Sequence, residues 1–282
     1  MPIISFVNDN NEQTGKTMSL VAIATYMAVN YNNRILIIST TNREDKIKTC
    51  FFEEKKVKKL KRGIFGENKV SLENESGIEG ISKISRSNKL TPEIITNYTR
   101  VVFKDRLEIL LGVEKTDEVN YSEIVEEYAD VINLAKSYYD IVFVDLDNDV
   151  GEENKQKIID NSDLVIVNST QNYTSLKKIK EKKDNEEILN TINELLLIGR
   201  YDKYSKYNFK NITRFLGEKN QVLTMPYNTL FFEAANEAGV PDLFLKLKKL
   251  SDYDDRNAIF LEEVKRASEN IVYRLQEIEA RM

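Results

Sequence analysis

The stretch from residue 3 to residue 17 reads Ile-Ile-Ser-Phe-Val-Asn-Asp-Asn-Asn-Glu-Gln-Thr-Gly-Lys-Thr. An apolar run leads into a polar loop, and the loop ends in Gly15-Lys16-Thr17, the ending of a phosphate-binding P-loop. In that motif the glycine lets backbone N–H groups approach a phosphate, the lysine reaches its outer oxygens, and the hydroxyl ligates Mg²⁺. Asn10 replaces the first glycine of the motif, and asparagine tolerates a left-handed backbone better than most residues.

The sequence around the loop supports this interpretation. Residues 17–30 have the apolar spacing of an amphipathic helix, and residues 34–39 form a second apolar run. A P-loop requires this order of strand, loop, helix and strand, whereas an ordinary helix-capping turn, the alternative, does not. We therefore expect the loop to bind nucleotide. The predicted nucleotide-binding residues of this segment are Gln13, Thr14, Gly15, Lys16, Thr17 and Met18.

Composition limits the chemistry that is open to the chain. Its 282 residues are 41% hydrophobic and 31% charged, with a formal net charge of −5. The chain has no histidine, which excludes histidine catalysis and histidine metal ligands, and its single cysteine, Cys50, excludes an internal disulfide. We find neither a secretory signal nor an apolar run long enough to span a membrane, so we expect a cytoplasmic protein.

Apolar runs and helical patterns alternate along the rest of the chain. A polar, lysine-rich stretch from about 42 to 97 has only weak helical pieces, and a helix is predicted at 121–138. The further predicted strands are 106–112, 139–145, 163–168, 194–200 and 221–226. This alternation predicts an α/β fold, a doubly wound and mostly parallel sheet flanked by helices. We expect one domain over residues 1–250, and a long C-terminal helix within residues 251–282 that packs on the domain or on a partner.

A second motif completes the expected site. The strand 139–145 is apolar and ends in Asp145, as a Walker B strand does, so Asp145 and Thr17 are the predicted Mg²⁺ ligands. Asp147 and Asp149 follow at a spacing of two, which is also found in calcium loops. The glycine and the terminal glutamate of a calcium loop are absent, and we reject that alternative.

Taken together, these segments resemble the MinD/ParA superfamily of P-loop ATPases of the SIMIBI class, and the pattern is most similar to CpaE/TadZ-type localisation proteins. The resemblance spans about residues 2–245. It rests on Thr14 to Thr17, on Asp145, and on the segments 200–202 and 226–228. It implies a bound ATP or ADP with Mg²⁺, a homodimer, and a base that lies near Arg200, Pro226 and Tyr227.

The chain also departs from that family. The lysine that reaches the partner's phosphates aligns with Asn11, next to Glu12, and the acidic pair expected after the second strand aligns with Ser39 and Thr41. These losses remove charges that stabilise the transition state and leave the binding frame in place. We therefore expect nucleotide binding with weak or negligible hydrolysis, which leaves the assignment as an enzyme open.

Two further features concern partners. Basic runs at 55–62 and 177–183 fit non-specific DNA binding, but solvated helix faces are favoured in an acidic chain. The last helix mixes acidic and basic residues, which fits packing better than attachment to anionic lipid. We expect a role in positioning or assembling a larger machinery, such as a pilus, secretion, conjugation or partition apparatus. The alternatives are a nucleotide-independent scaffold and a DNA-stimulated partition ATPase.

Overall fold

The structure is a computed structural model and describes residues 1–8, 13–53, 77–85, 91–113, 118–218, 222–248, 250 and 255–281. Within these residues, eight strands form one sheet in the spatial order β3-β4-β2-β5-β1-β6-β7-β8. The strands are β1 (Ile3–Asn8), β2 (Ile35–Ser39), β3 (Arg100–Phe103), β4 (Leu107–Leu110), β5 (Ile141–Asp145), β6 (Leu164–Ser169), β7 (Glu194–Tyr201) and β8 (Leu223–Pro226). Every neighbouring pair is parallel except β3 with β4.

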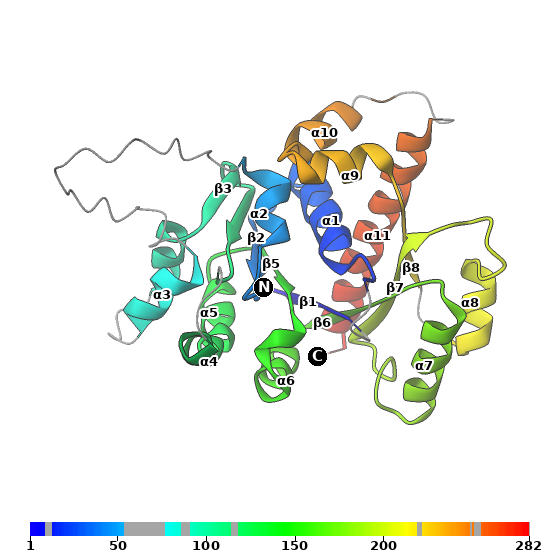
Figure 1. The fold of residues 1–282 in the computed structure, drawn as a ribbon, viewed down its shortest axis with the longest axis horizontal. Helices are drawn as coiled ribbons and strands as arrows, with labels where there is room; N and C mark the ends of the chain where they lie inside the picture. The colour runs from blue at the N-terminus through cyan, green and yellow to red at the C-terminus, as the bar shows by residue number, and fades with distance from the viewer. Residues whose placement is uncertain are drawn as a thin grey trace.

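Helices cover both faces of the sheet (Figure 1). One face is covered by α1 (Lys16–Asn30), α2 (Lys46–Phe51), α9 (Thr229–Asn236), α10 (Val240–Leu247) and α11 (Arg256–Glu279). The other is covered by α3 (Ile78–Ser85), α4 (Glu118–Val125), α5 (Tyr128–Ala135), α6 (Glu152–Asp160), α7 (Tyr173–Asp184) and α8 (Phe209–Leu216), with the short 3₁₀ helices η2 (Pro92–Asn97) and η3 (Asn148–Val150). The predicted doubly wound, mostly parallel α/β fold is therefore confirmed.

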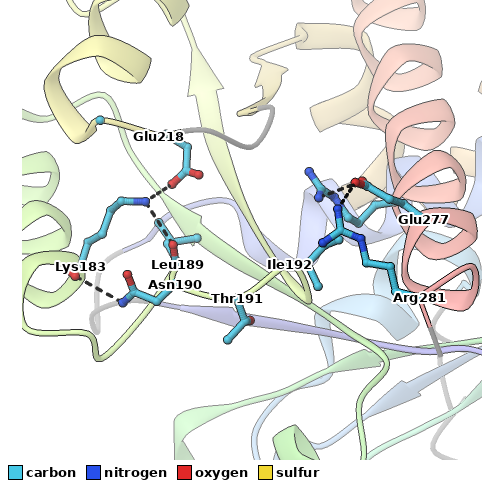
Figure 2. Close-up of a pocket in the computed structure, with 10 residues that line it drawn as sticks. Lys183, Leu189, Asn190, Thr191, Ile192, Glu218, Glu277 and Arg281 are labelled. Carbon is cyan, nitrogen blue, oxygen red and sulfur yellow. Dashed lines mark hydrogen bonds and ion pairs between the residues drawn. The ribbon is translucent and has the colours of Figure 1, made fainter.

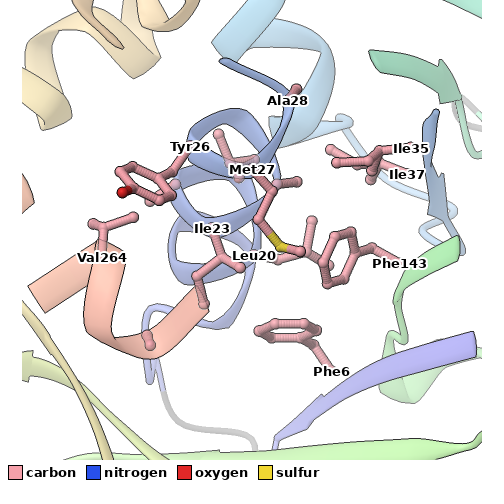
Figure 3. Packing of buried hydrophobic residues seen from close by; sticks show 14 of the residues in the cluster. Phe6, Leu20, Ile23, Tyr26, Met27, Ala28, Ile35, Ile37, Phe143 and Val264 are labelled. Atoms are coloured by element: carbon pink, nitrogen blue, oxygen red, sulfur yellow. The ribbon is translucent and has the colours of Figure 1, made fainter. Parts of the chain in front are cut away.

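Burial on both faces explains why the strands are almost continuously apolar. In β1, Phe6 packs toward α1 while Ile3 and Val7 pack toward the opposite layer. Figure 3 shows the side chain of Met27 from α1 beside the ring of Phe143 and above that of Phe6. The centroids of the two rings lie 6.0 Å apart in an edge-to-face arrangement. This packing fixes α1, which begins at Lys16, over the centre of the sheet.

The last helix, α11, packs against β8 and α1. Its buried apolar positions are Phe260, Val264, Ala267, Ile271 and Ile278. The division into residues 1–250 and 251–282 stays a prediction. None of the helices in the described ranges combines the length and apolarity needed to cross a membrane.

Two local predictions were wrong or incomplete. The helix expected at 121–138 is divided into α4 and α5, because the backbone N–H of Glu127 donates to the carbonyl of Ile124 in a tighter turn. Strand β3 was not predicted, and it pairs antiparallel with β4 at the edge of the sheet. Neither difference alters the central strands that carry the candidate site.

Candidate functional site

The predicted P-loop lies at the carboxyl end of β1, in the middle of the sheet. β5 and then β2 lie on one side of β1, and β6 and then β7 lie on the other. In open α/β sheets, ligands bind outside the carboxyl ends of the strands where the winding direction changes. The loop therefore occupies the expected place for a ligand site.

The side chains of Lys16 and Thr17 converge on one carboxylate. The ammonium of Lys16 lies 2.8 Å from Oδ1 of Asp145 and also donates to the carbonyl of Leu146 at 2.5 Å. The hydroxyl of Thr17 donates to Oδ2 of Asp145 at 2.7 Å. Lys16 and Asp145 are buried, with 6% and 8% of their surface exposed. The fold thus brings Asp145 to the adjacent residues Lys16 and Thr17, although Asp145 lies 128 positions beyond Thr17 in sequence.

Glycines shape the loop at two points. Gly15 precedes α1 with φ at +81°, a left-handed conformation that glycine adopts without strain. Gly199 of β7 lies directly beside the loop, and a Cβ on Gly199 would be 2.0 Å from the carbonyl oxygen of Thr14. Thr14 itself is buried and donates through its hydroxyl to the side-chain oxygen of Asn8. Thr14 and Gly15 are therefore held closely between the end of β1 and β7.

The residues predicted to contact the base, Arg200, Pro226 and Tyr227, make fewer contacts with one another than Lys16, Thr17 and Asp145 do. A guanidinium nitrogen of Arg200 lies 3.5 Å from the side-chain oxygen of Gln13, and Arg200 has a left-handed φ of +51°. Pro226 pairs with Tyr201 at the end of β8, next to Arg200 in the sheet. Tyr227 is 59% exposed and packs on Phe232. Arg200 thus borders the loop and Pro226 lies beside the strand that carries Arg200, whereas the described contacts of the Tyr227 ring lie on α9.

Two parts of the predicted site remain, Met18 and the first half of the loop. The side chain of Met18 is partly buried and packs against the core on the α1 side of the sheet. Asn10, Asn11 and Glu12 lie outside the described residues.

Sequence reasoning missed a carboxylate at this edge of the sheet. Asp45, four residues beyond Thr41, is 2% exposed and accepts hydrogen bonds from the backbone N–H groups of Ile47 and Gly112. Burial raises the pKa of Asp45, and the charge of Asp145 raises this pKa further. An aspartate before a short helix signals an N-cap, but nothing in the sequence signals its burial. Asp45 ties α2 to the turn after β4.

A second link joins the loops that follow β2 and β5. Arg43 makes two contacts of 2.7 Å with the two carboxylate oxygens of Asp149. Asp147 caps η3 by accepting from the N–H of Asp149. The two aspartates are therefore used in helix capping and in an ion pair.

The donor set suits Mg²⁺ with a phosphate ligand. The hydroxyl of Thr17 and the carboxylate of Asp145 are hard oxygen donors already in contact, which is what Mg²⁺ prefers. No cluster of three or more Asp, Glu or Cys side chains arranged for a metal occurs in the described ranges. A metal here would therefore depend on phosphate and water oxygens for its remaining ligands.

The basic runs have different outcomes. The run 55–62 lies outside the described residues. The run 177–183 lies on α7, where Lys177 pairs with Glu181 and Lys180 with Asp184. These exposed pairs one turn apart are those of a solvated helix face.

A separate cavity of about 390 Å³ lies at the opposite edge of the sheet (Figure 2). Its residues 190–192 and 217–218 precede β7 and β8, whereas the P-loop follows β1, and these strands are parallel. Lys183 pairs there with Glu218, and Arg281 pairs with Glu277. Glu277 also pairs with Arg274. The cavity is bordered by the C-terminal ends of α7 and α11, which disfavour an anion, so it is a weaker candidate for a phosphate than the P-loop at the start of α1.

Comparisons with known proteins agree with this geometry. No family model and no curated protein matches the chain. Among solved structures, a ParA family ATPase from Chlorobium tepidum has a TM-score of 0.65 at 14% identity, covering 92% of this chain and 96% of that one. The septum site-determining protein MinD from Pyrococcus horikoshii, complexed with Mg-ADP, has a TM-score of 0.62 at 12% identity, covering 96% and 97%.

A third structure is a Borrelia burgdorferi protein assigned to plasmid partition and bound to AMPPNP. Its TM-score is 0.59 at 18% identity, with 98% of each chain covered. Identities this low establish architecture and leave the activity to be argued from the site. This chain has the fold of the ParA and MinD P-loop ATPases.

Proposed function

We propose that this chain binds ATP or ADP with Mg²⁺ at the P-loop and turns it over weakly or negligibly. The observation that carries the proposal is the convergence of Lys16 and Thr17 on Asp145 at the carboxyl end of β1. The nucleotides named for the two solved structures, Mg-ADP and AMPPNP, support the same choice of ligand.

Each residue has a distinct role in this proposal. Lys16 exchanges its ion pair with Asp145 for phosphate oxygens, and the loop N–H groups after Gly15 donate to the same phosphates. Thr17 and Asp145 would hold Mg²⁺, which neutralises phosphate charge when bound. Gln13, Arg200 and Pro226 would border the base, with Tyr227 beyond them.

At the level of the cell, we propose a cytoplasmic protein that positions or assembles a larger machinery, similar in pattern to CpaE/TadZ-type proteins, and acts as a homodimer. A MinD from Aquifex aeolicus has been solved in complex with MinC, so a protein with this fold does bind a protein partner. One observation favours a nucleotide-independent scaffold as the second candidate. The ion pair with Asp145 compensates the charge of Lys16 inside the protein without a ligand.

A binding titration distinguishes the nucleotide-binding protein from the nucleotide-independent scaffold. The fluorescence of an N-methylanthraniloyl ATP analogue would be followed with Mg²⁺ for wild type, Lys16→Ala, Thr17→Ala and the exposed control Lys246→Ala. We expect saturable binding in wild type and the control, and a loss of at least about tenfold in Lys16→Ala, which is about 1.4 kcal/mol. No binding by wild type at millimolar nucleotide contradicts the proposal and favours the scaffold.

Turnover is tested separately by release of inorganic phosphate. We expect a rate close to background with and without DNA. A robust Mg²⁺-dependent rate that Lys16→Ala abolishes would contradict weak hydrolysis, and stimulation of that rate by DNA would favour a partition ATPase.

A further inference from the structure

A groove of about 470 Å³ lies between α7 and α8, at the end of the sheet where β7 and β8 lie (Figure 1, yellow-green and yellow helices). Leu176 and Ile212 are buried beneath it, and Tyr173 and Phe215 border it with 51% and 38% of their surface exposed. Exposed aromatic side chains around a preformed apolar hollow are a common feature of protein recognition sites.

The loop that forms one wall of the groove is fixed in place. The side-chain amide of Gln171 donates to the carbonyls of Asp202 and Tyr207, each at 2.9 Å. The ring of Tyr207 stacks on Tyr173, with centroids 5.9 Å apart and planes 19° apart. A partner would therefore meet an ordered surface and would lose little free energy in ordering it.

Two cations stand on the rim of the groove. The ammonium of Lys206 lies 4.9 Å from the centre of the Tyr207 ring, and the guanidinium of Arg214 donates to the side-chain oxygen of Asn211. Both side chains are exposed, and no carboxylate of the described residues lies within ion-pair distance of either. Both charges are therefore available to a partner.

The surroundings of the groove are basic although the chain as a whole is acidic. α7 carries five lysines against two acidic residues, and residues 201–216 carry three lysines and an arginine against one aspartate. The formal net charge of the whole chain is −5. The potential at this edge therefore selects an acidic partner.

We propose that this groove docks an acidic peptide segment of a protein partner, with a large apolar side chain between α7 and α8 and flanking carboxylates on Lys206 and Arg214. Two features favour a peptide over nucleic acid. The floor of the groove is mostly apolar, and the rings of Tyr173 and Tyr207 stack on each other, so no base inserts between them. This docking does not depend on nucleotide binding at the P-loop.

The test is a selection from a displayed random dodecapeptide library on immobilised wild-type protein, followed by fluorescence anisotropy of the enriched peptides. We expect enriched peptides to combine Asp or Glu with Phe, Leu or Trp. We expect the double variant Lys206→Glu/Arg214→Glu, and separately Tyr173→Ala, to weaken binding by at least about tenfold. The control Lys246→Glu makes one such charge reversal on α10, at a distance from the groove, and should leave the affinity unchanged.

Three outcomes overturn the proposal: enriched peptides without acidic residues, equal binding by the double variant, or no enrichment from the library. A labelled thymidine oligonucleotide forms the rival arm. If it binds wild type, loses binding in the double variant and is displaced by no selected peptide, the groove binds nucleic acid instead. The four replaced side chains are exposed, so each variant should fold, and thermal unfolding of each variant checks this.

Discussion

The ammonium of Lys16 lies 2.8 Å from a carboxylate oxygen of Asp145, and both residues are buried. The lysine that is proposed to bind phosphate thus also neutralises a buried carboxylate in the folded protein. Its replacement therefore affects stability as well as binding, and the two effects must be separated.

Lys16→Met should destabilise the protein by about 3 kcal/mol, because it leaves the carboxylate of Asp145 buried without its cation. The double variant Lys16→Met/Asp145→Asn should lose less than the sum of the single variants, because no net charge remains buried. Urea unfolding of the four proteins measures this coupling. Additive losses would show that the ion pair contributes nothing.

Gly199→Ala should distort the P-loop, because the new Cβ would lie 2.0 Å from the carbonyl oxygen of Thr14. We expect a loss of about 2 kcal/mol in stability from the overpacking and a loss of binding of the fluorescent ATP analogue.

Gly239→Ala is the matched control for that substitution. Its new Cβ would meet only Ala234 at 3.6 Å, an ordinary contact. Stability should therefore stay within about 0.5 kcal/mol of wild type, and binding should be unchanged. Equal effects of the two substitutions on thermal unfolding and binding would refute this account of the loop.

Asp45 should make stability fall as pH rises through the acidic range. Burial raises its native pKa above the unfolded value of about 3.9, so the folded protein binds the extra proton in that range. This contribution is fully present below the unfolded pKa and is lost as pH rises through the native pKa. Asp45→Asn lacks the contribution, so wild type should lose stability relative to the variant as pH increases.

Urea unfolding of wild type and Asp45→Asn at matched pH values measures that difference and cancels the contributions of the other carboxylates. A difference that stays constant with pH, or that changes with the opposite sign, would contradict burial of a carboxylate with a raised pKa.

Cys50 should be unreactive in the folded protein. It is 1% exposed, and burial raises the pKa of its thiol to about 12, so little thiolate forms at neutral pH. Reaction with a colorimetric disulfide reagent should be slow in buffer and fast in denaturant. Rapid reaction of the native protein would show that the layer around α2 opens readily.

The sequence predicted the central part of the fold correctly, because strongly apolar segments have few alternatives to burial. The run that ends in Asp145 and the run that precedes the P-loop became the adjacent strands β5 and β1. Strand β3 was missed, because its four residues include Arg100 and an exposed Val101, and its state depends on pairing with β4.

The break between α4 and α5 was also missed, since the apolar spacing continues through it. The tighter turn places Tyr121 where its hydroxyl donates to the carbonyl of Thr40, while Tyr128 enters the core. Apolar periodicity reports which face of a helix is buried and does not report how the backbone hydrogen bonds shift at a single turn.

The sequence by itself determined the class of fold, the strand and helix between which the predicted phosphate loop lies, and which residue types are available for chemistry. Only the tertiary structure decided that Lys16 is paired with Asp145, that Asp45 is buried beside Gly112, and that α7 and α8 enclose a basic, aromatic groove. The physical reason is the distance along the chain over which each effect acts. Hydrophobic periodicity and turn chemistry act over a few residues, whereas burial, ion pairing and grooves depend on which distant segments the folded sheet brings together.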